Sequence, residues 1–493
     1  KVEFTTKDEY ELNICNSVCE KISEYINLLE PSGLVIIAID GLAPVAKMVQ
    51  QRTRRFKSNI ISNLEREILE KESPLLWDKA SITPGTYFMS KLDISIRNYF
   101  KNYKLYNKRV KVLFSGSNEE GEGEHKIFSY MRKHKEYHNN SQTYIYGLDA
   151  DLIILSLNHL YLCNDIYLFR EKPEYDTKLN EIYKDEDHCF MKINGLEDII
   201  VETMKNNDND EYNKENKIKD YCFLSFFLGN DFLPHNPTLN IRTCGLDIII
   251  DSYKKIISNN KSICNGLNIN WKLLKKLIKE IGNNEKQYLE NEYRILKKQH
   301  YRYKNFEEKD EIKKLNNKPQ YNRDVEIYIN PTREYWKERY YEELFGIDDY
   351  ISKDNKTSLK SKDNEVLKQV CINYIEGLEW IWKYYSSDCI NNVWYYKYDY
   401  PPLFSDLIKY IPDFDMELIE KDIFKFGNST QLSYVLPPSS YALLSEKVKN
   451  YMLDNYNKKP VELKTTYCKY LWESHLDLED IDIFELDYNL KKL

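Results

Sequence analysis

The chain has 493 residues, of which 42% are hydrophobic, with only 15 Gly and 15 Pro. This composition excludes collagen-like and Gly/Pro-rich disordered classes, and the length predicts two or more domains, or one composite domain, with a sizeable core. The 71 basic and 79 acidic residues give a net charge of −8. This charge argues against a uniformly basic nucleic-acid-binding protein. A local basic patch can nevertheless bind a nucleic acid that the net charge repels.

The first half of the chain predicts an α/β arrangement. Residues 1–30 carry apolar side chains at helical spacing and predict one helix. Continuous apolar runs at 34–39, 110–115 and 143–148 are typical of buried parallel strands, and helical stretches separate them. The sequence therefore predicts a mostly parallel sheet core flanked by helices.

The rest of the chain changes character twice. Residues 170–217 are charged and irregular, which favours a surface excursion. Residues 255–330 are mainly helical in pattern, and their Lys-, Glu- and Asn-rich end at 305–330 is typical of a linker or solvated insertion. From about Tyr335 the sequence becomes aromatic and mixed up to its end.

Cysteine usage and hydropathy bear on the compartment. The ten cysteines include no CxxC pair, and no apolar run is as long as a membrane span. This pattern favours reduced thiols in an intracellular protein and disfavours a zinc site. The chain opens at Lys1 with neither Met nor a signal-like segment, so we expect its natural start to lie further upstream.

Carboxylates follow the predicted strands or lie near predicted helix ends. They are Asp40, Glu122, Glu124, Asp149, Asp151 and Asp231. Because ligands of open α/β sheets bind outside the carboxyl ends of the strands, we expect these six side chains to converge on one crevice. Such a cluster needs cations, and oxygen-only ligands favour Mg²⁺ or Mn²⁺, two of which suit in-line phosphodiester hydrolysis. The alternative is that each acid caps a helix, as Glu122 and Glu124 could at the helical run 125–133.

A basic helix is predicted directly after Asp40, with Pro44 at its first position. One face of this helix carries side chains at offsets of 0, 4, 7 and 8. They are Lys47, Gln51, Arg54 and Arg55. The same run contains Arg52 and Lys57 and no acid. A basic face beside a metal site can hold a phosphate, and Arg can do so with two hydrogen bonds. The alternative is a solvated basic helix or a nuclear-localisation patch.

The segment 394–402 is dense in aromatic rings. Exposed rings in a nucleic-acid channel stack on bases, and Trp394 is the candidate for this role. The alternative for most of these rings is ordinary core. Trp380 and Trp382 lie in the amphipathic helical pattern 374–385, and we assign both to the core.

Four segments together resemble the XRN family of 5′→3′ exoribonucleases. They are IAIDGLAPVAKMVQQRTRRF at 37–56, GEGEHK at 121–126, YGLDADLI at 146–153 and FLGNDFLPH at 227–235. Residues 374–380, 394–396 and 436–438 resemble the second conserved region of the family more loosely. The resemblance covers nearly the whole chain.

The resemblance implies a PIN/flap-nuclease-like core at 1–255, a helical connector and charged linker at 256–330, and a mainly helical, aromatic-rich second region at 331–493 that narrows the active-site entrance. The six carboxylates match the family's ligands for two Mg²⁺ ions, which Mn²⁺ could replace. The four side chains of the basic face match its pocket for a 5′-monophosphate, and Trp394 matches a stacking aromatic residue.

The implied activity is processive 5′→3′ degradation of single-stranded, 5′-monophosphorylated RNA to mononucleotides. The implied protein is a monomer with no membrane partner, and we expect it in the cytoplasm rather than the nucleus. Two features of the family have no counterpart within residues 1–30, namely a strand bearing another metal-site Asp and a His that stacks on the first base. The family's Trp beside the stacking position is Asn392 here.

Two alternatives stay open at this point. A catalytically impaired RNA-binding or scaffold homologue would fit the lack of the further Asp, whereas the six acids that are present argue against it. A structure-specific flap endonuclease would carry a Gly-rich helical hairpin after Asp231, where this chain reads FLPHNP.

Overall fold

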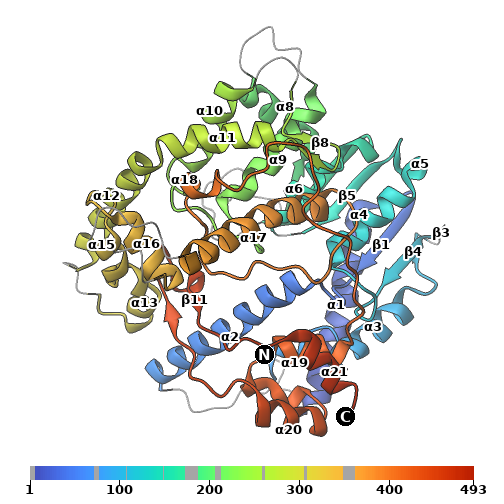
Figure 1. Ribbon diagram of the computed structural model, residues 1–493. Coiled ribbons are helices and arrows are strands. Elements are labelled where there is room, and N and C mark those ends of the chain that lie inside the picture. The colour runs from blue at the N-terminus through green and yellow to red at the C-terminus, as the bar shows by residue number, and fades with distance from the viewer. Residues whose placement is uncertain are drawn as a thin grey trace. The chain divides into compact units, whose positions relative to one another are not determined.

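A computed structural model describes residues 6–70, 77–106, 108–147, 149–172, 187–205, 213–257, 261–304, 308–347 and 361–493. The chain divides into two compact units, both discontinuous in sequence (Figure 1). The first unit comprises Lys1–Ile127, Glu307–Pro319 and Ile423–Leu493, and the second comprises Phe128–Phe306 and Gln320–Asp422. The functional division at 255 and 330 that the resemblance implies stays a prediction.

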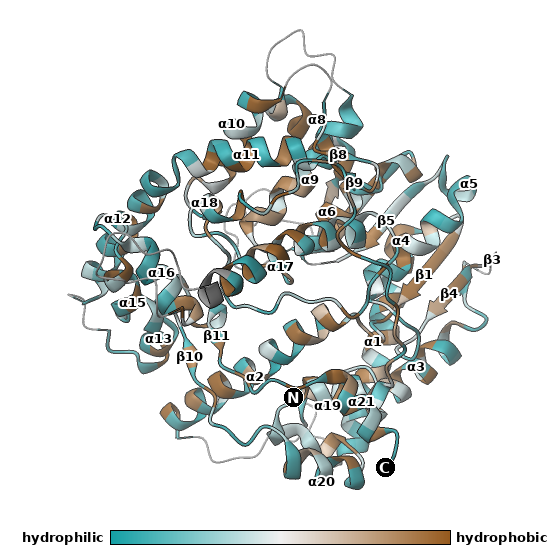
Figure 2. Ribbon diagram, viewed as in Figure 1, coloured by the Kyte–Doolittle hydropathy of each residue, from teal (hydrophilic) through white to brown (hydrophobic). Residues whose placement is uncertain are grey.

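The first unit is built around one pair of parallel strands, β1 (Leu34–Ala38) and β4 (Lys111–Ser115). Both are among the predicted apolar runs, and Figure 2 shows them mainly in the colour of hydrophobic residues. Helices α1 (Lys7–Leu29) and α3 (Tyr87–Phe100) pack against each other and share a buried core with Ile37 of β1. The predicted N-terminal helix is thereby confirmed.

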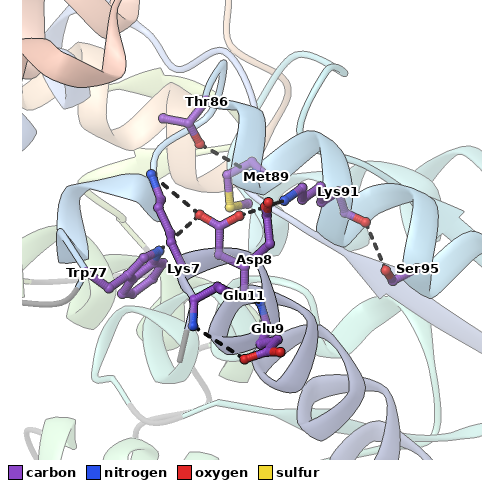
Figure 3. Close-up of polar contacts among 10 residues, drawn as sticks. Lys7, Asp8, Glu9, Glu11, Trp77, Thr86, Met89, Lys91 and Ser95 are labelled. Atoms are coloured by element: carbon purple, nitrogen blue, oxygen red, sulfur yellow. Dashed lines mark hydrogen bonds and ion pairs between the residues drawn. The ribbon is translucent and has the colours of Figure 1, made fainter. Parts of the chain in front are cut away.

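The buried carboxylate of Glu11 ties the start of α1 to α3 (Figure 3). Its Oε2 accepts a hydrogen bond from Lys91 Nζ at 2.9 Å, and its Oε1 accepts one from Trp77 Nε1 at 3.2 Å. A buried carboxylate needs such partners, because an unpaired charge away from water is strongly destabilising. Thr6 and Glu9 form a reciprocal capping box that fixes the first turn of α1.

The C-terminal part of the chain belongs to the first unit. Helix α2 (Val45–Ile68) packs against α19 (Asn428–Val435), and α19 packs against α21 (Ile483–Leu490). Helix α2 begins one residue later than predicted, since Pro44 is its N-cap. A short helix from the predicted linker, α13 (Glu311–Asn316), also contacts α2.

The second unit contains a separate three-stranded sheet, in the order β5 (Gln142–Tyr146), β6 (Asp165–Glu171) and β7 (His188–Lys192). Strands β5 and β6 are parallel, and β7 is antiparallel to β6. The α/β class is confirmed, but the expectation that the three apolar runs form one sheet is wrong for the described strands. An apolar run indicates a buried strand and does not specify its hydrogen-bonding partner.

The predicted surface excursion at 170–217 is wrong over the part that the structure describes. Strand β7 and helix α8 (Ile193–Met204) occupy most of it, and α8 packs on β6. Residues 173–186 and 206–212 lie outside the described residues. The predicted linker at 305–330 likewise contains α13, α14 (Lys318–Tyr321) and α15 (Asp324–Ile329).

The long helix α17 (Ser361–Ser386) lies in the second unit, and its Trp380 and Trp382 are buried, which confirms their assignment to the core. The remaining elements are η1 (Lys79–Ser81), β2 (Lys104–Leu105), β3 (Lys108–Arg109), α4 (Gly123–Lys133), α5 (Lys135–His138), α6 (Asp151–Asn158), η2 (Leu160–Leu162), α9 (Lys214–Ser225), η3 (Phe226–Leu228), α10 (Gly245–Ile256), β8 (Cys264–Asn265), β9 (Asn268–Ile269), α11 (Trp271–Asn283), α12 (Glu285–Lys304), α16 (Trp336–Phe345), α18 (Phe404–Leu407), η5 (Pro438–Leu443), α20 (Glu446–Asn455), β10 (Leu463–Lys464), η6 (Leu471–Glu473) and β11 (His475–Leu476). Over the described ranges, none of the helices has the length and apolar character needed to cross a membrane.

Candidate active site

The loops that follow β1 and β4 are joined by hydrogen bonds, and Asp40 lies where they meet. Asp40 Oδ1 accepts a hydrogen bond from Gly123 N at 2.7 Å, at the start of α4. Gly41 N donates to Gly121 O at 2.9 Å, and Gly121 N donates to Leu42 O at 2.8 Å. The first predicted metal-binding acid is therefore oriented by the backbone of the loop that carries Glu122 and Glu124.

Two charged side chains, the half-buried Lys126 and the buried Asp93, bind the backbone of these loops. Lys126 Nζ donates to Ile39 O at 2.7 Å and to Gly116 O at 2.8 Å, so it bridges the ends of both strands. Burial lowers the pKa of Lys126. Asp93 accepts hydrogen bonds from Ser117 N and Ser117 Oγ, each at 2.9 Å. Sequence reasoning missed both residues, although Lys126 lies within the GEGEHK segment.

The predicted phosphate-binding lysine and a predicted metal-binding acid are direct partners. Lys47 Nζ of α2 lies 2.6 Å from Glu122 Oε2, and both side chains are largely buried. Glu124 lies in the first turn of α4, where a carboxylate suits the helix dipole. The ion pair compensates the buried charge of Glu122 and joins the start of α2 to the acidic loop.

The other three residues of the predicted basic face differ in exposure. Gln51 is buried, Arg54 is exposed, and Arg55 is half-buried with Nη2 donating to Ile82 O at 3.3 Å. Burial, and then the neighbouring Arg54, lower the pKa of Arg55 to about 10, so its guanidinium is still charged at neutral pH. Arg55 Nε is a buried donor without a hydrogen-bond partner in the structure, and so is Arg52 Nε.

Two further cations of the basic run, Arg52 and Lys57, already have partners in the first unit. The guanidinium of Arg52 lies over the rings of Phe56 and Tyr434, with centroid distances of 5.5 and 5.1 Å. Its Nη2 donates to Asn457 Oδ1 at 3.0 Å. Lys57 donates to a backbone carbonyl of the C-terminal segment. These two cations anchor α2 to its neighbours and do not belong to the predicted phosphate face.

Two predicted acids of the second unit lie at the start of α6. Asp149 follows β5 and is exposed, and Asp151 is the first residue of the helix. Asp149 Oδ1 accepts a hydrogen bond from Leu152 N at 3.4 Å. This contact is that of a helix-capping acid, the alternative role for these carboxylates. The same carboxylate could still bind a metal ion.

The last predicted acid, Asp231, lies in a tight turn after η3. Gly229 adopts a φ of +94°, and a Cβ there would lie 2.8 Å from His235 Cβ, so only glycine fits. Asn230 Oδ1 accepts hydrogen bonds from the backbone N of Phe232 and from the amide that follows it, each at 2.9 Å. The turn gives Asp231 a defined place at the end of a buried apolar segment.

Trp394 is half-buried and rigidly held against α17. Its ring stacks on Trp380 at a centroid distance of 5.2 Å and an interplanar angle of 27°. Its Nε1 donates to Glu376 Oε2 at 3.4 Å, and a Cβ on Gly377 would lie 2.9 Å from the ring. Asn391, which sequence reasoning missed, accepts a hydrogen bond from Trp394 N at 2.8 Å. Trp394 therefore presents a preset ring, as a stacking residue requires.

Comparison with known sequences decides the family. The model of the XRN 5′-3′ exonuclease N-terminus matches residues 1–172, and that of the Xrn1 helical domain matches 211–329 and 307–471. The chain belongs to the XRN family. All four segments that carried the resemblance lie at least partly within these matches, and the matched ranges include all six acids and the basic helix.

Curated relatives agree with this family. The chain is 27% identical to the 5′-3′ exoribonuclease 2 homolog of Drosophila melanogaster, over 91% of this chain and 58% of the relative. It is 26% identical to 5′-3′ exoribonuclease 2 of Arabidopsis thaliana, over 91% of this chain and 56% of the relative. It is 27% identical to 5′-3′ exoribonuclease 1 of Schizosaccharomyces pombe, over 88% of this chain and 40% of the relative. The chain thus spans 40–58% of the length of these relatives.

Nucleases of the XRN family depend on divalent metal ions. The six acids divide equally between the two units. Among the residues that the structure describes, no three His, Cys, Asp or Glu side chains form a group that could hold a metal ion. The donor set itself fits a hard divalent cation, because every candidate ligand is a carboxylate. The convergence of all six on one site stays a prediction.

Proposed function

We propose that the chain is a processive 5′→3′ exoribonuclease that degrades single-stranded, 5′-monophosphorylated RNA to mononucleotides. The observation that carries the proposal is the 2.6 Å contact between Lys47 and Glu122. It brings the start of the basic helix to the acidic loops that follow β1 and β4. A terminal phosphate and the next phosphate along the RNA would then be bound by adjacent parts of the first unit.

Each group of side chains has a role in this proposal. Arg54 and Arg55 hold the terminal phosphate through charged hydrogen bonds, and Gln51 adds a neutral donor. Lys47 adds positive charge between this pocket and the acids. The six carboxylates would hold two Mg²⁺ ions, or Mn²⁺ in their place, and these ions supply an activated water and charge stabilisation for in-line hydrolysis.

The second conserved region supplies selectivity for the end of the RNA. Trp394 would stack on a base near the scissile end, on the side of its ring that Trp380 does not cover. A narrow entrance would admit a single strand with a free 5′ end and would exclude a cap or triphosphate. We also propose that the protein acts as a monomer in the cytoplasm, and the lack of a CxxC pair among its cysteines supports the intracellular setting.

The test uses three RNAs of one sequence that differ only at the 5′ end, which carries a monophosphate, a hydroxyl or a cap. With Mg²⁺ present, we expect the monophosphorylated RNA to decay fastest and to release mononucleotides. Equal decay of all three RNAs would refute the phosphate pocket. Release of internal fragments would instead indicate an endonuclease.

A matched variant tests the metal role. Asp149→Ala should abolish turnover while RNA binding is retained, because the acid is proposed to act on the reaction and not on affinity. A fully active Asp149→Ala protein would refute its assignment as a ligand. RNA binding by the wild-type protein without any decay would favour the scaffold alternative.

A further inference from the structure

We infer that Gln431 is a positioning residue of the proposed active site, which holds the loop between Asp40 and helix α2. The inference rests on the proposed exoribonuclease function. It concerns the first unit alone, since Gln431, Asp40 and α2 all belong to that unit.

Both ends of the Gln431 side-chain amide bind the same short loop. Gln431 Oε1 accepts a hydrogen bond from Ala43 N at 2.8 Å, and Nε2 donates to Gly41 O at 3.3 Å. The side chain is only 1% exposed, so no water competes for these bonds. A buried amide that is fully paired fixes its partners, whereas an unpaired one would be costly.

The loop held by Gln431 connects two parts of the proposed site. It begins after Asp40 and ends at Pro44, the N-cap of α2, which makes no side-chain capping hydrogen bond. Lys47 lies in the first turn of the helix that follows. Glu119 O would lie 1.6 Å from a Cβ on Gly41, so the loop already sits tightly against the acidic loop. A small shift of this loop would move both Asp40 and the start of α2.

Gln431 is itself held by the C-terminal segment. Asp487 of α21 accepts hydrogen bonds from Thr430 Oγ1 at 2.7 Å and from Gly427 N at 3.2 Å, at the start of α19. A continuous set of contacts therefore runs from α21 through α19 to the loop beside Asp40. Gln431 makes the contacts to the loop, whereas the hydrogen bonds to Asp487 hold the start of α19 to α21.

The experiment compares three variants of the full chain. Gln431→Met keeps the length of the side chain and removes both hydrogen bonds. Gln431→Glu keeps the acceptor for Ala43 N and removes the amide donor. Thr430→Val is the control, because it removes the neighbouring hydrogen bond to Asp487 and leaves the loop contacts intact. Each variant is assayed on monophosphorylated RNA across Mg²⁺ concentrations, and the unfolding midpoint is recorded.

A positioning role predicts a change in metal dependence. Gln431→Met should raise the half-saturating Mg²⁺ concentration about tenfold and lower kcat/KM by about 10–100-fold, since small misplacements at a reacting centre are costly. Gln431→Glu should shift both values in the same direction as Gln431→Met, because it removes the donor to Gly41 O and places a carboxylate oxygen there. Thr430→Val should lower the unfolding midpoint, and its half-saturating Mg²⁺ concentration should stay at the wild-type value. Hydrogen–deuterium exchange without RNA should show faster exchange at residues 41–43 in Gln431→Met and Gln431→Glu but not in Thr430→Val.

Two results would overturn the inference. One is wild-type Mg²⁺ dependence and wild-type exchange at residues 41–43 in Gln431→Met. The other is an equal Mg²⁺ shift in Thr430→Val, which would indicate a general loss of structure. If Gln431→Met does not fold, Gln431→Glu decides by the same criteria. If the wild type degrades no RNA, the proposed function fails, and the exchange data together with Mg²⁺ binding by calorimetry still decide the role of Gln431.

Discussion

Helix α2 carries two sets of basic residues, and the two sets have different surroundings. Arg52 is buried between two aromatic rings, and Lys57 donates to Ser474 O at 2.6 Å. Arg54 is exposed, and Arg55 is half-buried with a hydrogen bond to Ile82 O. The difference teaches that a run of positive charge is not one functional unit. Burial and existing partners separate the cations that hold the helix from those that can hold a phosphate.

Stability is assigned to one set of cations and substrate recognition to the other. The acids of the loops that follow β1 and β4 belong to neither set and are proposed to serve the reaction itself. Substitutions in the three groups should therefore change different measured quantities. The four predictions below run from the largest expected effect to the smallest.

Asp40→Asn should have the largest effect. The amide can still accept the hydrogen bond from Gly123 N, but it removes the charge proposed to hold a metal ion. We expect turnover to fall by about a thousandfold with unfolding and RNA binding unchanged. Asp8→Asn, at an exposed acid of α1, is the control and should keep full turnover. Turnover above a tenth of wild type in Asp40→Asn would contradict the role of this acid.

Arg54→Met should weaken recognition of the 5′ end. An exposed guanidinium contributes little to folding, so the free energy of unfolding should stay at its wild-type value. The kcat/KM for monophosphorylated RNA should fall about 100-fold, as expected when a charged contact to phosphate is lost. The value for hydroxyl-ended RNA should not change. A similar loss on both RNAs would indicate a general RNA contact instead.

Arg52→Met should change stability and leave recognition intact. Methionine keeps the apolar packing between Phe56 and Tyr434 but loses the cation–π contacts and the hydrogen bond to Asn457. We expect the free energy of unfolding to fall by about 2 kcal/mol. Denaturant unfolding measures this change. An unchanged midpoint would show that Arg52 does not anchor the helix.

Lys57→Met should have the smallest effect of the four. It removes one half-buried hydrogen bond, that to Ser474 O, and we expect a loss of about 1 kcal/mol in the free energy of unfolding. Thermal unfolding can resolve this difference. Decay of monophosphorylated RNA should keep its wild-type rate at temperatures where the variant is folded. A drop in kcat/KM confined to monophosphorylated RNA would place Lys57 in the phosphate pocket after all.

Local features of the fold could be predicted from the sequence. Helical spacing located α1, and apolar runs located β1, β4 and β5, because periodicity and burial act over a few residues. Strand β6 was missed, since its short apolar centre at 166–169 is flanked by charges. The pairing of β1 with β4 and of β5 with β6 depends on contacts between distant parts of the chain. So does the packing of the C-terminal segment on α2. Periodicity does not encode such contacts.

The candidate site divides in the same way. Asp40 and Asp149 could be found because they end predicted strands, and Lys47 because of its place on a basic face. Its ion pair with Glu122 could not be foreseen, since it joins separate loops. Gln431 is a single amide within an ordinary helix, and no local pattern marks it. The convergence of all six acids stays a prediction.

The division of the α2 cations into two sets is tested most directly by the ratio of decay rates for monophosphorylated and hydroxyl-ended RNA, measured side by side in wild type, Arg54→Met and Arg52→Met. Assays are run at a temperature where all three proteins are folded. A high ratio is predicted in wild type and Arg52→Met, and a ratio about 100-fold lower in Arg54→Met. An unchanged ratio in Arg54→Met, or an equal collapse in Arg52→Met, would contradict this division.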